Sequence, residues 1–168
     1  KKKNHLLVAL DNNETELFRM LEFCINFATQ NKKKNIILRI HPILDNYFEI
    51  YNRIISLTKN INNLNLSNKS LHVDLKKSKY LLFTDTVIGV SCLYYKVIPL
   101  FFMNKLNKNI FNNNFPKKYI IKNYVDLKKI LSKKTKNKLP TYFNYYKNNY
   151  FERYDLTELI KIIASNKI

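Results

Sequence analysis

The sequence is short of the residues on which several common protein classes depend. Its 168 residues include two cysteines, three histidines, one glycine and no tryptophan. Cys24 and Cys92 cannot build a disulfide framework or supply four zinc ligands, and no histidine pair has the spacing of a zinc protease motif. The longest apolar runs, such as residues 97–103, are far shorter than the roughly 18 residues of a membrane-spanning helix. These shortages argue against a metal site, a disulfide-rich fold and a transmembrane segment.

Acidic residues are also scarce, which makes the chain strongly basic. It has 12 acidic and 30 basic residues and a formal net charge of +18. Lysine accounts for 26 of the basic residues and arginine for only 4, while asparagine occurs 25 times and isoleucine 19 times. All of these abundant residues have A/T-rich codons, so an A+T-rich genome would raise them together. A specific nucleic-acid binder would favour arginine for bidentate contacts, so we expect no specific nucleic-acid partner.

The positive charge is unevenly distributed along the chain. Residues 1–85 carry 14 basic and 8 acidic side chains, whereas residues 86–151 carry 13 basic and 1 acidic side chain. Segment 86–151 is therefore predicted to form a basic face, and the partner of such a face is expected to be anionic.

The apolar pattern predicts an α/β fold. Short continuous apolar runs alternate with helical spacing, which is typical of a mostly parallel sheet with crossover helices in a Rossmann-like, three-layer domain. Strands are expected over residues 5–10, 35–40, 64–66, 80–84, 97–102 and 119–121. Helices are expected over residues 14–30, 45–59, 70–77, 87–95, 126–131 and 155–164. The inward face of the first helix is expected to consist of Leu17, Met20, Leu21, Cys24 and Ala28, and that of the second of Phe48, Tyr51, Ile54, Ile55 and Thr58. The lysine- and asparagine-rich tracts 104–118 and 132–149 are predicted to be loops.

Candidate ligand contacts follow three of the predicted strands. An open parallel sheet binds its ligands beyond the carboxyl ends of the strands, and polar residues stand at three such ends: Asp11-Asn12-Asn13, His41-Pro42 and Thr84-Asp85-Thr86. None of these turns contains the G-x-G-x-x-G pattern of a dinucleotide fold, and the single glycine, Gly89, lies inside a helix pattern.

Each of these residues has a functional and a structural interpretation. His41 could donate to a phosphate or act as an acid near neutral pH, or it could simply be satisfied by backbone at a strand end. Thr84 and Thr86 could hold a phosphate together with free N–H groups at a helix start, or they could serve only as helix caps. Asp11 is expected to be a turn residue.

The order of these segments resembles a known family. The sequences Arg39-Ile40-His41-Pro42 and Val97-Ile98-Pro99-Leu100, with residues 77–93 between them, are similar to the C-terminal domain of GT-B fold glycosyltransferases of surface polysaccharides. Sialyl- and polysialyltransferase-like enzymes and the glycerophosphate transferases that use CDP-glycerol are the nearest in pattern. The resemblance covers residues 5–102 well. Ser91 and Cys92 stand where these families have a Glu-Ala pair, and Val87 replaces a hydroxyl residue.

The resemblance implies a function and a set of site residues. In these families this half of the enzyme binds the activated nucleotide donor, which would be a CMP-linked or other nucleotide-linked sugar. His41 would be the catalytic residue, and the resemblance carries over His41 and Thr86 as contacts to the donor phosphates. From their positions at the strand ends, Thr84 is expected as a further phosphate contact, and Asn12, Asn13, Pro42 and Asp85 are expected to line the crevice for nucleotide and sugar. No cofactor and no metal are expected.

The same resemblance predicts the context of the chain. Residues 1–168 would form one domain of a longer bacterial protein, whose other domain holds the acceptor. The protein would be cytoplasmic, at or near the inner face of an anionic membrane. The alternative is a non-catalytic Rossmann-like domain with a degenerate donor site, which binds an anionic partner through its basic face. The missing glutamate and the missing hydroxyl residue at Val87 favour this alternative.

Overall fold

The computed structural model describes residues 5–84, 87–103, 115–132 and 139–150. Within these residues, six strands form one sheet in the order β3-β2-β1-β4-β5-β6, and every neighbouring pair is parallel. The strands are β1 (His5–Ala9), β2 (Ile36–Arg39), β3 (Leu64–Leu66), β4 (Ser78–Phe83), β5 (Ile98–Phe102) and β6 (Ile120–Ile121). The predicted Rossmann-like α/β fold is confirmed.

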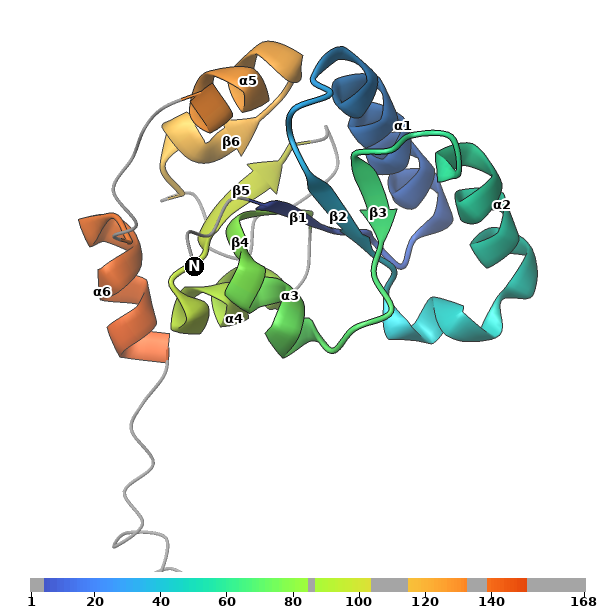
Figure 1. Ribbon diagram of the computed structural model, residues 1–168. Coiled ribbons are helices and arrows are strands. Elements are labelled where there is room, and N and C mark those ends of the chain that lie inside the picture. The colour runs from blue at the N-terminus through green and yellow to red at the C-terminus, as the bar shows by residue number, and fades with distance from the viewer. Residues whose placement is uncertain (1–4, 85–86, 104–114, 133–138, 151–168) are drawn as a thin grey trace, which may run out of the picture.

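Helices cover both faces of this sheet (Figure 1). One face carries α1 (Glu14–Gln30), α2 (Phe48–Thr58) and α5 (Tyr124–Ser132); the other carries α3 (Leu71–Lys77), α4 (Ile88–Ser91) and α6 (Thr141–Tyr150). Three 3-10 helices complete the described chain: η1 (Pro42–Asn46), η2 (Cys92–Tyr95) and η4 (Lys117–Tyr119). Because both faces are covered, the central strands are mainly apolar, and Leu7, Leu81 and Leu100 are fully buried.

The first helix forms as its sequence predicts. The side chain of Asn13 accepts a hydrogen bond from the backbone N–H of Glu16 at 3.2 Å and so caps one of the free donors at the helix start. The predicted apolar stripe is buried, and it consists of Leu17, Met20, Leu21, Cys24 and Ala28. At the other end, the buried amide of Asn63 lies within hydrogen-bonding distance of the carbonyls of Ala28, Asn31 and Lys34. This amide ties the turn after α1 to the start of β3.

The second helix buries a narrower face than predicted. Of the five residues expected to face inward, Ile54 and Thr58 are buried. Phe48 is 76% exposed, and Tyr51 and Ile55 are also exposed, so the prediction was wrong for these three. The reason is that α2 lies beside β3, an edge strand of only 3 residues, which offers a narrow surface to cover.

The loop predicted over residues 132–149 is wrong in part, because α6 begins at Thr141. Phe143 is fully buried and packs against Phe115 and Tyr119, with ring centroids 5.7 and 5.1 Å away. Lysine and asparagine dominate the composition of this tract, yet its aromatic side chains supply the buried face. The helix predicted over residues 155–164 lies outside the described residues.

No helix within the described ranges is long and apolar enough to cross a membrane.

Gly89 allows α4 to lie close to β4. A Cβ atom at this position would lie 2.3 Å from Cε2 of the Phe83 ring. Phe83 is fully buried and has Phe101 and Phe115 around it, with ring centroids 5.8 and 6.5 Å away. The ring therefore has little room to give way.

We expect Gly89→Ala to lower the free energy of unfolding by about 1 kcal/mol or more in chemical denaturation. Overpacking costs about 1–3 kcal/mol, which exceeds the gain of about 1 kcal/mol in helix propensity. Ser91→Ala is the control, since its hydroxyl makes one hydrogen bond, to the Val87 carbonyl, at the surface. An unchanged denaturation midpoint for Gly89→Ala would contradict this close packing.

Candidate functional site at the carboxyl edge of the sheet

The parallel strands bring the predicted site residues to one edge of the sheet. Asp11 follows β1, His41 follows β2, and Thr84 follows β4, so all three lie at the carboxyl edge. From β1 the chain continues to β2 and β3 on one side of the sheet, and from β4 it continues to β5 and β6 on the other side. The position between β1 and β4 is therefore the topological switch point, where ligands of open α/β sheets bind. Asp85 and Thr86 lie outside the described residues.

A hydrogen bond between Thr84 and Asp11 links the ends of β1 and β4 at the switch point. The Thr84 hydroxyl donates to Oδ2 of Asp11, and the other carboxylate oxygen accepts from the N–H of Asn13 at 2.9 Å. Thr84 is fully buried and Asp11 is 7% exposed. Asp11 is therefore the predicted turn residue and also a cross-strand acceptor, which the sequence did not reveal. The expected phosphate contact through Thr84 needs correction, because its hydroxyl is committed to Asp11 and out of reach of a ligand.

Asn12 and Asn13 stand beside this pair at the start of α1. Asn12 is exposed and free to face a ligand, whereas the side-chain oxygen of Asn13 caps the helix. Both residues are exposed at the predicted edge, and the side-chain oxygen of Asn13 is already engaged in the helix cap.

His41 is held in one hydrogen-bonding state by the backbone. Its Nδ1 accepts from the N–H of Ile43 at 3.3 Å and so caps η1. A ring nitrogen that accepts carries no proton, so the neutral ring has its proton on Nε2. As one interpretation of the sequence expected, a backbone group is the hydrogen-bond partner of one ring nitrogen, Nδ1. The other side, Nε2–H, is a donor at the partly exposed edge of the sheet.

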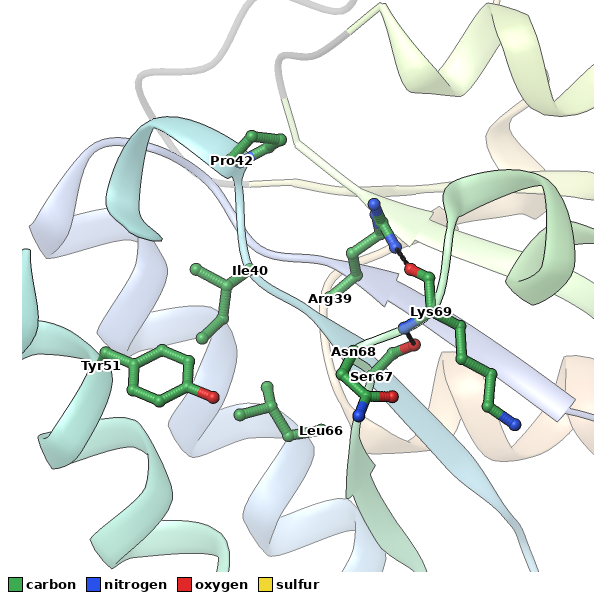
Figure 2. A pocket seen from close by; sticks show the side chains of 8 residues that line it. All are labelled: Arg39, Ile40, Pro42, Tyr51, Leu66, Ser67, Asn68 and Lys69. Atoms are coloured by element: carbon green, nitrogen blue, oxygen red, sulfur yellow. Dashed lines mark hydrogen bonds between the residues drawn. The ribbon is translucent and has the colours of Figure 1, made fainter. Parts of the chain in front are cut away.

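A hollow of about 280 Å³ lies next to Pro42 (Figure 2). It is bounded by the end of β2, by α2 and by the loop that follows β3, and its lining comprises Arg39, Ile40, Pro42, Tyr51, Leu66, Ser67, Asn68 and Lys69. In Figure 2 the Tyr51 hydroxyl points inward, and the 67–69 loop forms the opposite wall. Of the predicted crevice residues, Pro42 lines this hollow, whereas Asn12 and Asn13 belong to the neighbouring strand end.

A polar network that the sequence did not reveal anchors the wall of the hollow. Nη1 of Arg39 donates to the carbonyl of Lys69 at 2.6 Å and to Oδ2 of Asp74 at 3.1 Å. The same carboxylate oxygen accepts from the Ser67 hydroxyl at 2.7 Å. Asp74 is 1% exposed, so the network joins β2, the loop after β3 and α3 through a buried carboxylate. Asp74 has no motif in its sequence surroundings, and only the fold brings it to Arg39.

The described residues of this edge supply hydrogen-bond donors that suit an anion. Donors are available at His41, at the nitrogens of Arg39 other than Nη1, and at Lys69. Within the described ranges, no three His, Cys, Asp or Glu side chains gather in a way that could hold a metal ion. Burial raises the pKa of the Cys24 thiol, which keeps it protonated and far from any nucleophilic role.

We expect Thr84→Val to lower the free energy of unfolding by about 1–3 kcal/mol, because it leaves the buried Oδ2 of Asp11 without its donor. Thr84→Ser keeps the hydroxyl and should retain most of the stability. Both variants are compared by urea denaturation. Equal urea denaturation midpoints for the valine variant and the parent chain would contradict a stabilising hydrogen bond between Thr84 and Asp11.

The chain matches no protein-family model and no curated protein. It is similar to solved structures. One is UDP-GlcNAc 2-epimerase from Methanocaldococcus jannaschii, with 16% identity and a TM-score of 0.53 over 98% of this chain and 46% of that one. The same enzyme in complex with UDP-GlcNAc and UDP gives 15% identity and a TM-score of 0.55 over 96% and 45% of the two chains.

A third similar structure contains accessory secretory proteins 1, 2 and 3 from Streptococcus pneumoniae. The identity is 13% and the TM-score 0.55, over 98% of this chain and 35% of that chain. The present chain thus spans less than half of the length of each solved chain. At these identities the likeness shows the fold, which is a Rossmann-like domain of the GT-B type.

Proposed function

We propose that this domain binds the nucleotide of an activated sugar at its carboxyl edge. It would serve as the donor-binding domain of a bacterial glycosyltransferase-like protein of surface polysaccharide synthesis, and the acceptor domain would lie outside this chain. The GT-B type of fold supports the proposal, and one similar structure has UDP-GlcNAc and UDP bound. The sialyltransferase-like motifs at residues 39–42 and 77–93 support a donor of the CMP or CDP class.

The observation that carries the proposal is the hydrogen bond from the N–H of Ile43 to Nδ1 of His41. Since Nδ1 accepts this hydrogen bond, Nε2 is the ring nitrogen left as a donor, at the end of β2 on the carboxyl edge of the sheet. A neutral N–H donor suits a phosphate oxygen and needs no prior protonation of the ring. His41 is therefore proposed as a hydrogen-bond donor to the donor phosphates, in preference to a role as a proton donor.

The hollow next to Pro42 suits the base of the nucleotide. Its volume of about 280 Å³ lies just below the usual range of about 300–1,000 Å³ for whole-ligand pockets, so it would take one part of the donor. Tyr51 offers an aromatic ring for stacking, and the 67–69 loop offers main-chain polar groups (Figure 2). A phosphate at His41 and a base beyond Pro42 are then neighbours in one bound nucleotide.

The proposed chemistry is the stabilisation of a leaving phosphate. When the bond between the sugar and the phosphate oxygen breaks, negative charge grows on that oxygen, and a preorganised donor at His41 stabilises it. Thr86 would be the second phosphate contact, on the strength of the family motif, and Asp85 would line the crevice. The acceptor hydroxyl and the base that deprotonates it would come from the other domain.

The second candidate is a binding domain that has lost the donor site. The segment 87–95 contains no carboxylate, and its Ser91 and Cys92 side chains donate hydrogen bonds to the backbone carbonyls of Val87 and Gly89. A ribose contact from this helix, which the family motif would supply through glutamate, is therefore missing. Such a domain would keep the fold and bind an anionic partner.

We expect His41→Ala to weaken nucleotide binding about tenfold to a hundredfold, the value of one hydrogen bond to a charged group. Calorimetry with CMP, CDP, UDP and GDP identifies the base and measures the loss. The nucleotide-induced rise in melting temperature should vanish in parallel.

Two variants separate binding from stability. His41→Asp retains an acceptor for the N–H of Ile43 but repels phosphate, so it should remain stable and not bind. His72→Ala changes an exposed histidine on α3, whose Nδ1 lies 3.0 Å from the Tyr95 hydroxyl, and should bind normally. If the folded parent chain binds none of the nucleotides at millimolar concentration, the donor-site proposal fails and the second candidate stands.

Tyr51→Ala should weaken binding of the nucleotide about fivefold to a hundredfold, because stacking of one base contributes about 1–3 kcal/mol. Binding of inorganic pyrophosphate, which has no base, should be unchanged. Tyr94→Ala, on η2, is the matched control. Equal losses for nucleotide and pyrophosphate would exclude the hollow as the place of the base.

A further inference from the structure

The opposite edge of the sheet gathers a row of exposed lysines. Because all described strands are parallel, the segments that enter them meet at the amino edge. The segments before β2, β3, β4, β5 and β6 all contribute. Their exposed lysines, which we call the amino-edge lysines, are Lys32, Lys33, Lys59, Lys76, Lys77, Lys96, Lys117 and Lys118. The connecting residues 31–35, 59–63, 76–77, 96–97 and 115–119 contain no acidic residue.

Among the described residues, most acidic side chains lie toward the other edge. Asp11, Glu14, Glu16, Glu49 and Asp126 stand in turns that leave strands or in the first turns of α1, α2 and α5. Asp74 contacts Arg39 at the end of β2, and Glu22 lies in the middle of α1. In the described part of the chain, the connections at the amino edge therefore carry positive charge only, whereas the carboxyl edge carries both signs. The basic surface also differs from the predicted face of residues 86–151, since Lys32, Lys33 and Lys59 come from the first half of the chain.

Codon usage and helix dipoles do not account for the whole arrangement. Codon usage raises the number of lysines but does not remove acidic residues from one edge. The helix dipole favours cations in the last turn of a helix, where Lys76 and Lys77 of α3 lie, but α1 and α2 have no basic residue in their last turns. Lys32 and Lys33 lie in the turn beyond α1, and Lys59 is the residue after the last of α2.

Hydrogen bonds anchor one of the turns at the amino edge. The Asn63 amide holds the turn that carries Lys32 and Lys33. Nζ of Lys34 donates to the carbonyl of Leu131 at 2.9 Å and joins this turn to α5. Adjacent strands are about 4.8 Å apart, so six strands set the lysines along roughly 24 Å.

We propose that the amino edge docks on an anionic phospholipid membrane. Lysine is a flexible point charge, which suits laterally mobile headgroups, whereas this edge offers no arginine fork for nucleic-acid bases. Tyr94 (62% exposed) beside Lys96, and exposed Leu57 near Lys59, add amphipathic and apolar contacts at the same edge. The acidic side chains of the carboxyl edge would turn that edge, with its proposed nucleotide site, toward water. The docking does not depend on the nucleotide.

Vesicle sedimentation with the 168-residue chain tests the proposal. The vesicles contain phosphatidylcholine with or without one third phosphatidylglycerol, at physiological ionic strength. Lys59→Gln/Lys118→Gln removes charges just before β3 and β6, and Lys69→Gln/Lys122→Gln removes the same number just after those strands. We expect the first variant to bind anionic vesicles about thirtyfold more weakly, from about 1 kcal/mol per lysine, and the second to bind nearly like the parent chain.

Lysine acetylation read by mass spectrometry checks the orientation without substitutions. Anionic vesicles should protect Lys32, Lys59 and Lys118 and leave Lys122 reactive. The proposal is overturned if both double variants lose binding equally, if the parent chain ignores anionic vesicles, or if Lys122 is protected as strongly as Lys118. It is also overturned if single-stranded DNA at equal charge concentration displaces the vesicles, since the edge would then prefer nucleic acid.

Discussion

The shared direction of the six described strands is the constraint on which the rest of the molecule depends. Every connection that leaves a strand emerges at the carboxyl edge, and every connection that enters one arrives at the amino edge. Residues far apart in the chain are thereby sorted into two groups, which lie at opposite ends of the same strands. The polar candidates Asp11, His41 and Thr84 meet at one end. The lysines of the helix-to-strand turns meet at the other.

At the carboxyl edge, the polar groups divide into those that hold the fold and those that are free to bind. Asp11 and Thr84 satisfy each other across the switch point, and Asp74 holds Arg39 at the wall of the hollow. Such buried groups are fully occupied because an unpaired one would destabilise the fold. His41 belongs in part to both groups. Backbone contact fixes one ring nitrogen and thereby leaves the other as an oriented donor.

The elements predicted most accurately are those whose signals are local. Helix α1 was predicted residue for residue, because a capping asparagine and a regular apolar stripe are both encoded within 18 residues. The inward face of α2 was predicted too wide, since the width of the strand beneath it is set by segments elsewhere in the chain. Helix α6 was missed because polar residues dominate its composition, and its burial depends on Phe115 and Tyr119, which precede it by more than 20 residues.

By itself, the sequence determined the alternation of strands and helices, the carboxyl-edge location of His41 and the excess of positive charge. These follow from apolar spacing, strand ends and composition, which are properties of short stretches of chain. Tertiary structure alone decided that Thr84 is bonded to Asp11, that Asp74 reaches Arg39 and that lysines from five connections form one edge. Those outcomes depend on strand order and on distances between residues remote in sequence, and no local pattern records them.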